Sequence, residues 1–168
     1  MLYFSYGSNM SFRRLSQRIT SARFVDTASL TKHQLKFHKA GSDSSAKCDA
    51  HFTDDEMHIV HGVVFDISKS DKIILDRYEG LGAGYDEKMV IVNLSSDNLI
   101  EVSTYYATNI DLMLKPFHWY KEHVLVGARE NDFPNDYISK IAMTESIEDH
   151  DQARHDAELE IYFSGCNK

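Results

Sequence analysis

The sequence predicts an α+β fold in which helices pack against a small curved or barrel-like sheet. Short runs of aromatic and β-branched residues, typical of strands, recur between Leu2 and Thr108. Helical periodicity interrupts these runs twice and dominates the chain from Phe117 onward. This mixture of strands and helices, together with a hairpin, favours the α+β class.

The first elements are a strand, a tight loop and a helix. Residues 2–6 form a short aromatic strand that meets a run of turn formers, Gly7-Ser8-Asn9. Asn9 or Ser11 can cap the helix that follows. Apolar residues recur within it at three- and four-residue spacing, so the helix is expected to extend through Arg18.

Four strands are predicted next, at residues 22–30, 34–39, 47–53 and 59–67. The last of these is the strongest prediction, because it concentrates β-branched and aromatic residues. A polar stretch over residues 41–45 separates the second strand from the third, and its composition is typical of an exposed loop.

A second helix follows the strand at residues 59–67. Ser68 and Asp71, three residues apart, resemble a capping box, and apolar residues on one helical face come after them. This helix is expected to end at Glu79 and Gly80, because glycine is the usual residue beyond a helix C-terminus.

The rest of the chain predicts a hairpin and a helical end. Residues 88–94 and 100–108 flank a short polar turn and form the hairpin. From Phe117 the pattern is helical, and Phe133-Pro134 divides it into segments. The total length predicts a single domain over residues 1–168.

The charge balance excludes several classes of partner. With 18 basic and 26 acidic residues the formal net charge is −8, and this negative field repels nucleic acid and anionic membrane surfaces. No stretch approaches the ~18 apolar residues of a membrane span. Cys48 and Cys166 are the only cysteines and cannot build a disulfide framework, so the protein is expected to be cytoplasmic.

No metal or other cofactor is expected. The nine histidines include no HExxH motif, and His58 and His61 fall on opposite faces of a predicted strand. The glycines of residues 80–84 follow a helix and precede a strand, whereas a dinucleotide-binding loop joins a strand to a helix.

Glu79 is the first candidate for catalysis. A carboxylate in the last turn of a helix faces the negative end of the helix dipole, which disfavours its charged form. A general acid or base that works near neutral pH benefits from such an environment. A solvated glutamate at a helix end is the alternative, and the residue pattern alone leaves it open.

Two further groups of residues could contact a ligand. At Tyr6-Gly7-Ser8-Asn9, a glycine between a strand and a helix lets successive backbone N–H groups form an anion-binding nest. A plain tight turn is the alternative. Tyr105, Tyr106 and Tyr120, with Trp119, could line a small-molecule pocket or belong to the core.

Together these segments resemble the γ-glutamylcyclotransferase family, which has the AIG2-like fold. The motifs that carry the resemblance are residues 3–10 (YFSYGSNM), residues 62–65 (GVVF), residues 75–80 (LDRYEG), and Tyr120 with residues 127–131 (GAREN). Their order and spacing match the family from Leu2 to about Tyr137. The resemblance does not cover residues 147–168, which are expected to be a helical tail.

The resemblance implies a small mixed β-barrel flanked by helices, with Glu79 as the catalytic acid and base. Asn9-Met10 resembles the branch of the family that acts on γ-glutamyl amino acids, and it differs from the branches that act on glutathione or on γ-glutamylamines. The substrate-binding residues implied by the resemblance are Tyr3, Phe4, Ser5, Tyr6, Gly7, Ser8, Asn9, Tyr105 and Tyr120.

The reaction implied is the intramolecular cyclisation of a γ-glutamyl amino acid or peptide to 5-oxoproline, with release of the amine. Two alternatives stay open. One is cyclisation of another γ-glutamyl amide, such as an amine conjugate or a biosynthetic intermediate, and the other is a non-catalytic small-molecule-binding module on the same fold. The expected partner is a small γ-glutamyl substrate, and the aromatic strands would suit a homodimer.

Overall fold

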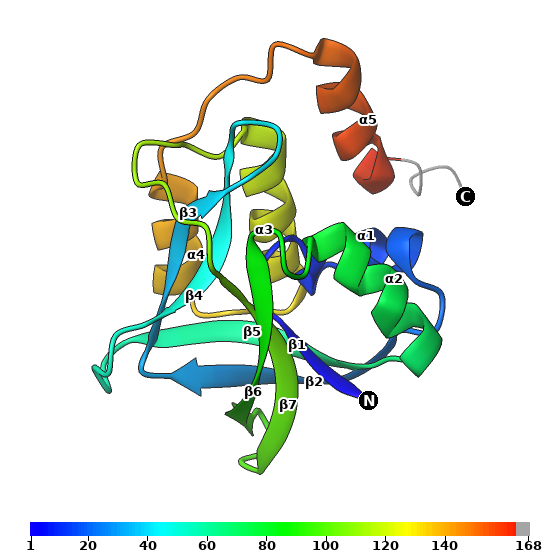
Figure 1. Ribbon diagram of the computed structural model, residues 1–168. Helices are drawn as coiled ribbons and strands as arrows, with labels where there is room; N and C mark the ends of the chain where they lie inside the picture. Colours follow the sequence, from blue (N-terminus) through cyan, green and yellow to red (C-terminus); the bar gives the residue numbers. More distant parts are fainter. Residues whose placement is uncertain (164–168) are drawn as a thin grey trace.

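A closed barrel of five strands forms the centre of the computed structural model, which describes residues 1–163 (Figure 1). Its strands are β1 (Leu2–Ser5), β2 (Arg23–Thr31), β5 (Ile59–Asp66), β6 (Tyr85–Leu94) and β7 (Leu99–Ala107). They are ordered β1, β5, β2, β6, β7 around the barrel. Tyr3 and Ser103 pair β1 with β7 in parallel, and all other neighbours are antiparallel. The predicted barrel-like sheet is confirmed.

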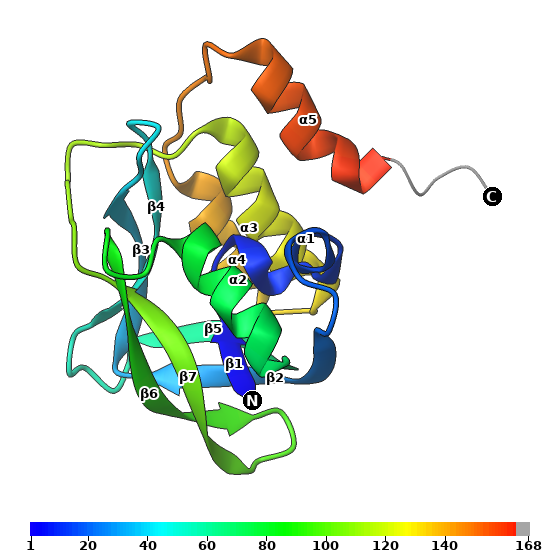
Figure 2. The ribbon, with the colours of Figure 1, turned by 45° about the vertical axis from the view of Figure 1, so that its right-hand side comes forward.

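Two more strands form a hairpin beside the barrel (Figure 2). They are β3 (His33–Ala40) and β4 (Ala46–Phe52). A register shift just before Lys39 places this residue directly opposite Lys47. The hairpin contacts β7, because the Asp49 carboxylate accepts a hydrogen bond from Ala107 N at 2.8 Å. Both strands and the polar loop between them match the sequence prediction.

The helices gather at one end of the barrel, and α5 lies outermost (Figures 1 and 2). The elements are the 3-10 turn η1 (Ser8–Met10) and the helices α1 (Phe12–Arg18), α2 (Lys69–Glu79), α3 (His118–Glu130), α4 (Asn135–Met143) and α5 (Gln152–Phe163). α2 begins where Ser68 Oγ accepts a hydrogen bond from Asp71 N at 3.1 Å, and it ends at Gly80, which has a left-handed φ of 70°. Both predicted caps are confirmed. None of the described helices has the length and apolar character to span a membrane.

The start of α1 differs from the expectation that a side chain caps it. Ser11 occupies the N-cap position, but its side chain makes no capping hydrogen bond. Asn9 belongs to η1, and its amide donates to Glu79 instead. The Asn9 side chain therefore serves a contact between distant elements of the chain.

Two glycines allow close approach around η1. A Cβ atom on Gly62 of β5 would lie 2.4 Å from Ser5 O, and one on Gly127 of α3 would lie 2.6 Å from Met10 Cβ. No side chain fits at either position. Because α3 packs so closely on Met10, the whole turn of residues 8–10 is buried next to the barrel.

Polar contacts hold α5 against α1 and α3. Arg14 of α1 forms an ion pair with Glu158 of α5. His123 of α3 is completely buried, with Nε2 at 3.0 Å from Glu158 Oε2 and Nδ1 at 2.8 Å from the Tyr162 hydroxyl. The tail expected over residues 147–168 is thus helical from Gln152 to Phe163, and residues 164–168, with Cys166, lie outside the described residues.

Candidate active site

Glu79, the last residue of α2, is held against the N-terminal turn by two donors. Asn9 Nδ2 donates a hydrogen bond to Glu79 Oε1 at 2.8 Å and lies 3.5 Å from the Tyr3 hydroxyl. Arg18 Nη1 lies 3.2 Å from the same carboxylate oxygen and 3.0 Å from Asn9 Oδ1. The Glu79 side chain is 15% exposed, and no described residue hydrogen-bonds its other oxygen, Oε2. One oxygen is therefore fixed, and the other can meet a substrate.

The backbone after Glu79 explains this position. Gly80 is left-handed, and Leu81 N donates to Asp76 O at 2.9 Å, which closes the helix and leaves Glu79 in its last turn. The negative end of the helix dipole would repel the carboxylate there. The guanidinium of Arg18 opposes this repulsion from the other side.

Three tyrosines form one wall around Glu79. Tyr6 donates its hydroxyl hydrogen to Tyr105 O at 2.7 Å, and the Tyr105 hydroxyl donates to Asp76 Oδ1 at 2.7 Å. Burial raises the pKa of the Tyr3, Tyr6 and Tyr105 hydroxyls, and the charge of Glu79 raises the pKa of Tyr3 further. All three therefore remain protonated near neutral pH.

The opposite wall comes from β4, β6 and α3. The Tyr120 hydroxyl accepts a hydrogen bond from Cys48 N at 3.0 Å, and the Tyr85 hydroxyl donates to Cys48 O. A Cβ atom on Gly7 would lie 3.2 Å from Cys48 Cβ, so β4 packs tightly on the N-terminal turn. Burial raises the pKa of the Cys48 thiol, which keeps it protonated and unreactive.

Two adjoining cavities lie between these walls. The inner one has a volume of about 30 Å³, and the outer one, of about 130 Å³, shares Ser8, Glu79, Tyr85 and Tyr120 with it. The predicted residues that line the inner cavity are Tyr3, Ser5, Tyr6, Gly7, Ser8, Asn9, Glu79, Tyr105 and Tyr120.

Phe4 does not line either cavity, although the resemblance implied a binding role for it. Alternation along β1 turns its side chain into the barrel core, where it is fully buried. Tyr106 and Trp119 also lie away from the cavities, and Trp119 Nε1 donates to Asp149 at 2.7 Å.

Sequence reasoning missed Arg18, Cys48 and Tyr85. Arg18 and Cys48 lie at distant positions in the sequence, on other elements than Glu79, and no local spacing links them to it. Tyr85 begins β6, just after the loop that follows Glu79. The aromatic character of Tyr85, directly after the glycines of residues 80–84, was the one available signal.

Comparisons with known proteins show the family of this chain. An AIG2-like family model matches residues 59–141. A γ-glutamylcyclotransferase from Bos taurus is 32% identical over 154 residues, which cover 89% of this chain and 80% of the relative. The human protein of the same name is 32% identical over 148 residues, covering 86% of this chain and 78% of the relative. This chain belongs to the γ-glutamylcyclotransferase family.

The γ-glutamylcyclotransferase fold extends along almost all of the chain. A solved structure named γ-glutamyl cyclotransferase matches with a TM-score of 0.83 at 27% identity, covering 95% of this chain and 98% of that one. The AIG2-like match includes Glu79, Tyr105 and Tyr120 and begins after the N-terminal turn. The resemblance predicted from the motifs is confirmed.

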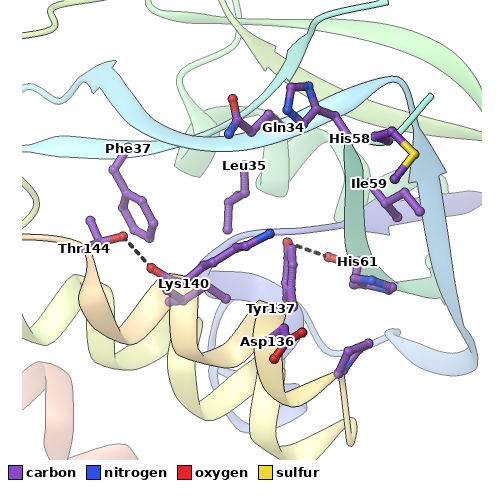
Figure 3. Close-up of a pocket in the computed structure, with 13 residues that line it drawn as sticks. Gln34, Leu35, Phe37, His58, Ile59, His61, Asp136, Tyr137, Lys140 and Thr144 are labelled. Atoms are coloured by element: carbon purple, nitrogen blue, oxygen red, sulfur yellow. Dashed lines mark hydrogen bonds between the residues drawn. The ribbon is translucent and has the colours of Figure 1, made fainter. Parts of the chain in front are cut away.

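A roomier cavity of this γ-glutamylcyclotransferase-family protein lies elsewhere, between α4 and strands β3 and β5 (Figure 3). Its volume is about 390 Å³, and Leu35, Phe37 and Ile141 supply apolar walls. Tyr137 donates to His61 O across it at 3.3 Å. Burial in this cavity lowers the pKa of His61. The cavity contains none of the predicted site residues. The convergence of buried polar groups on Glu79, rather than cavity size, makes the cavity beside Glu79 the candidate active site.

The β3–β4 hairpin of this γ-glutamylcyclotransferase-family protein also brings His38, Asp49 and His51 together, with ligand atoms within 4.8 Å of one another. Such a set could hold a metal ion. His38 Nε2 already lies 2.9 Å from Asp49 Oδ2, so the buried pair satisfies itself. Sequence spacing did not reveal this cluster, because it forms across two strands.

Proposed function

We propose that this protein is a γ-glutamylcyclotransferase that converts a γ-glutamyl amino acid or peptide to 5-oxoproline and a free amine. The observation that carries the proposal is the Glu79 carboxylate, which lines a cavity walled by protonated tyrosines, with Oε1 fixed by Asn9 and Arg18 and Oε2 without a hydrogen bond to any described residue. The names of the bovine and human relatives support the same activity.

The proposed reaction is an attack of the substrate on itself. The α-nitrogen bonds to the γ-carbonyl carbon and closes a five-membered lactam, and the bond from that carbon to the leaving nitrogen breaks. The α-ammonium starts with three protons and the lactam nitrogen keeps one, so two protons pass to the leaving amine, which departs as an ammonium. An intramolecular attack of this kind has an effective molarity that reaches ~10⁵ M or more in favourable geometry.

Proton transfer is then the main task left to the protein. In this proposal Glu79 takes a proton from the α-ammonium through Oε2 and returns one to the leaving nitrogen, which the absence of a described hydrogen-bond partner for Oε2 supports. The first N–H groups of the η1 turn have no partner within that turn, so those of Ser8 and Asn9 can donate to the γ-carbonyl oxygen as it becomes negative.

A substrate panel tests the proposal. Purified protein would be incubated with γ-glutamyl amino acids, γ-glutamylamines and glutathione, and 5-oxoproline, free glutamate and the released amine would be measured. We expect equal amounts of 5-oxoproline and amine, without glutamate. Glutamate as the product would indicate hydrolysis, and no product from any compound would favour the binding module. A cytoplasmic location and a homodimer stay predictions.

A further inference from the structure

Lys39 brings an unpaired positive charge to the outer cavity beside Glu79. The residue is only 8% exposed and lines this cavity together with Ser8 and Tyr120. Within residues 1–163, no carboxylate oxygen lies within 4.0 Å of the Lys39 ammonium, and no hydrogen bond joins it to another residue. A buried ammonium without an anion is costly, because it has lost water without gaining a partner.

The other charges around the cavity are already balanced. Lys47 Nζ lies 2.7 Å from Asp43 Oδ2, and Arg18 lies 3.2 Å from Glu79. Each of these cations has its own carboxylate. The charge of Lys39 is therefore the one in the described lining of the outer cavity that forms no ion pair within 4.0 Å, and the carboxylates of Glu79 and Asp43 attract it only from a greater distance.

The hairpin geometry adds to this imbalance. Lys39 and Lys47 are directly opposite each other on β3 and β4, so two like charges face the same side of the hairpin. Burial lowers the pKa of both ammonium groups, and the charge of Lys39 lowers the pKa of Lys47 further. An anion entering the outer cavity would relieve this repulsion.

The Lys39 side chain is also held in place. Its ammonium lies 4.7 Å from the centre of the Tyr85 ring. A Cβ atom on Gly84 would lie 3.0 Å from Lys39 Nζ. The absence of a side chain at Gly84 therefore makes room for the Lys39 ammonium. An ordered cation at a cavity wall is preorganised to bind an anion, since little side-chain entropy remains to be lost.

We infer that Lys39 binds the carboxylate of the leaving amino acid, and that it makes the enzyme selective for γ-glutamyl amino acids over γ-glutamylamines. The inference rests on the proposed function, because it concerns the leaving group of that reaction. Under the proposed function, the γ-glutamyl group would bind at the side of the two adjoining cavities that Asn9 lines, the bond that breaks would lie at Glu79, and the leaving group would extend toward Lys39 in the outer cavity.

Two substrates that differ only in this carboxylate test the inference. γ-Glutamyl-alanine and γ-glutamyl-ethylamide have the same amide and the same carbon chain, apart from the carboxylate. We expect the wild type to prefer γ-glutamyl-alanine by roughly 10- to 100-fold in kcat/KM, the range of a hydrogen bond between charged groups. Lys39→Met should abolish this preference by raising the KM of γ-glutamyl-alanine, with γ-glutamyl-ethylamide turned over as by the wild type.

Two further variants serve as controls. Lys39→Arg keeps the charge and should keep most of the preference. Lys36→Met changes a lysine of the same strand that lines neither cavity, and should behave as the wild type. Binding to the Glu79→Gln protein, measured by calorimetry, gives a readout without turnover, and γ-glutamyl-alanine should bind more tightly than γ-glutamyl-ethylamide.

Each negative result of these experiments contradicts either the inference alone or the proposed function as well. Equal use of both substrates by the wild type overturns the inference while the proposed function stands. Equal loss of both substrates in Lys39→Met also overturns it, because Lys39 would then contact the γ-glutamyl part or support the fold. Absence of 5-oxoproline from every compound contradicts the proposed function itself, and the inference with it.

Discussion

At the scale of single residues, Asn9 connects the η1 turn to Glu79, the proposed acid and base. Its amide nitrogen donates to Glu79 Oε1, and its amide oxygen accepts from Arg18. Both polar ends of the side chain are therefore used, and the residue is 3% exposed. The same contacts determine which oxygen of Glu79 remains open to the cavity.

Asn9→Ala should lower kcat by roughly 10- to 100-fold, because a misplacement of about 1 Å in a catalytic group has a cost of that size. KM should change less, since the tyrosine walls remain. Steady-state kinetics of 5-oxoproline release measure both constants. Asn98→Ala is a suitable control, because the Asn98 side chain lies in an exposed turn and donates hydrogen bonds to Ser96, far from Glu79 in the sequence and outside both cavities. A kcat near that of the wild type in Asn9→Ala would show that Asn9 does not position Glu79.

Residues of the site were predictable from the sequence only where a motif carried them. Glu79 and the turn of residues 7–9 belong to such motifs, and the structure brings them within hydrogen-bond distance. Tertiary packing alone brings Arg18 into an ion pair with Glu79 and places Lys39 in the same cavity lining. The residues next to Arg18 and Lys39 in the sequence form no motif that would predict either position.

At the scale of elements, the packing of α3 on η1 determines where the turn of residues 8–10 lies. Gly127→Ala would place a methyl group 2.6 Å from Met10 Cβ. Overpacking costs about 1–3 kcal/mol, more than the ~1 kcal/mol that alanine gains over glycine in helix propensity. We expect a net loss of up to about 2 kcal/mol in the free energy of unfolding, and about a tenfold loss in kcat/KM as the turn shifts.

Chemical denaturation and kinetics of Gly127→Ala measure these two effects. Glu122→Ala on the same helix is the control, because its side chain is 42% exposed and changes there usually stay within ±0.5 kcal/mol. Unaltered stability and activity in Gly127→Ala would mean that α3 and η1 can separate without consequence.

The docking of α5 should make stability depend on pH. Burial lowers the pKa of His123 to about 4, against an ordinary value of 6.5. The unfolded chain therefore takes up the proton first as pH falls, and the free energy of unfolding should decrease between pH 6.5 and pH 4, by on the order of 3 kcal/mol. Glu158 adds a second pH dependence. Burial raises the pKa of the Glu158 carboxyl, but the hydrogen bond from His123 and the charge of Arg14 outweigh burial and hold this pKa well below its usual range. The stability that the charged Glu158 contributes is therefore lost as the pH falls below 4.5.

Denaturant unfolding at a series of pH values measures the slope of the free energy of unfolding against pH. His123→Gln should make it shallower between pH 6.5 and pH 4, because the titrating group is gone. His150→Gln, at an exposed position, should leave it unchanged. Identical slopes in the wild type and His123→Gln would show that His123 titrates normally in the folded protein.

The elements themselves were largely predictable, because each has its own local signal. Ser68 and Gly80 mark the ends of α2, and Pro134 separates α3 from α4. β6 begins at Tyr85, before the predicted residue 88, since Tyr85 pairs with Ala107 across the hairpin. That extension depends on the partner strand and has no counterpart in local composition.

At the scale of the whole molecule, the cavity brings together β1, β4, β6, β7, α2 and α3, so a bound substrate should stabilise the entire fold. Glu79→Gln protein with its best substrate at 100 times Kd should gain about 2.7 kcal/mol. For a chain of this size that corresponds to a rise in Tm of about 5–10 °C. Thermal melts with the free leaving amino acid in place of the substrate are the control. An unchanged Tm at saturating substrate would argue against binding in this cavity.

The closure of the barrel is the part of the fold that was hardest to predict from sequence patterns. Periodicity identifies strands, but the parallel pairing of β1 with β7 joins residues 100 positions apart, such as Tyr3 and Ser103. The resemblance to a family supplied the barrel, and the structure shows how it closes. This closure also places Tyr3 and Tyr105 side by side, with ring centres 5.7 Å apart.

Glu79→Gln is the most direct test of the proposed chemistry. The substitution keeps the size of the side chain and an oxygen for Asn9, and removes both the negative charge that pairs with Arg18 and the ability to accept and return a proton. We expect 5-oxoproline release to fall by roughly 10²- to 10⁴-fold while the protein remains folded, as its far-UV circular dichroism would show. Glu101→Gln, exposed on β7, should retain full activity. A Glu79→Gln protein that releases 5-oxoproline at a rate near that of the wild type would contradict the assignment of Glu79 as the acid and base.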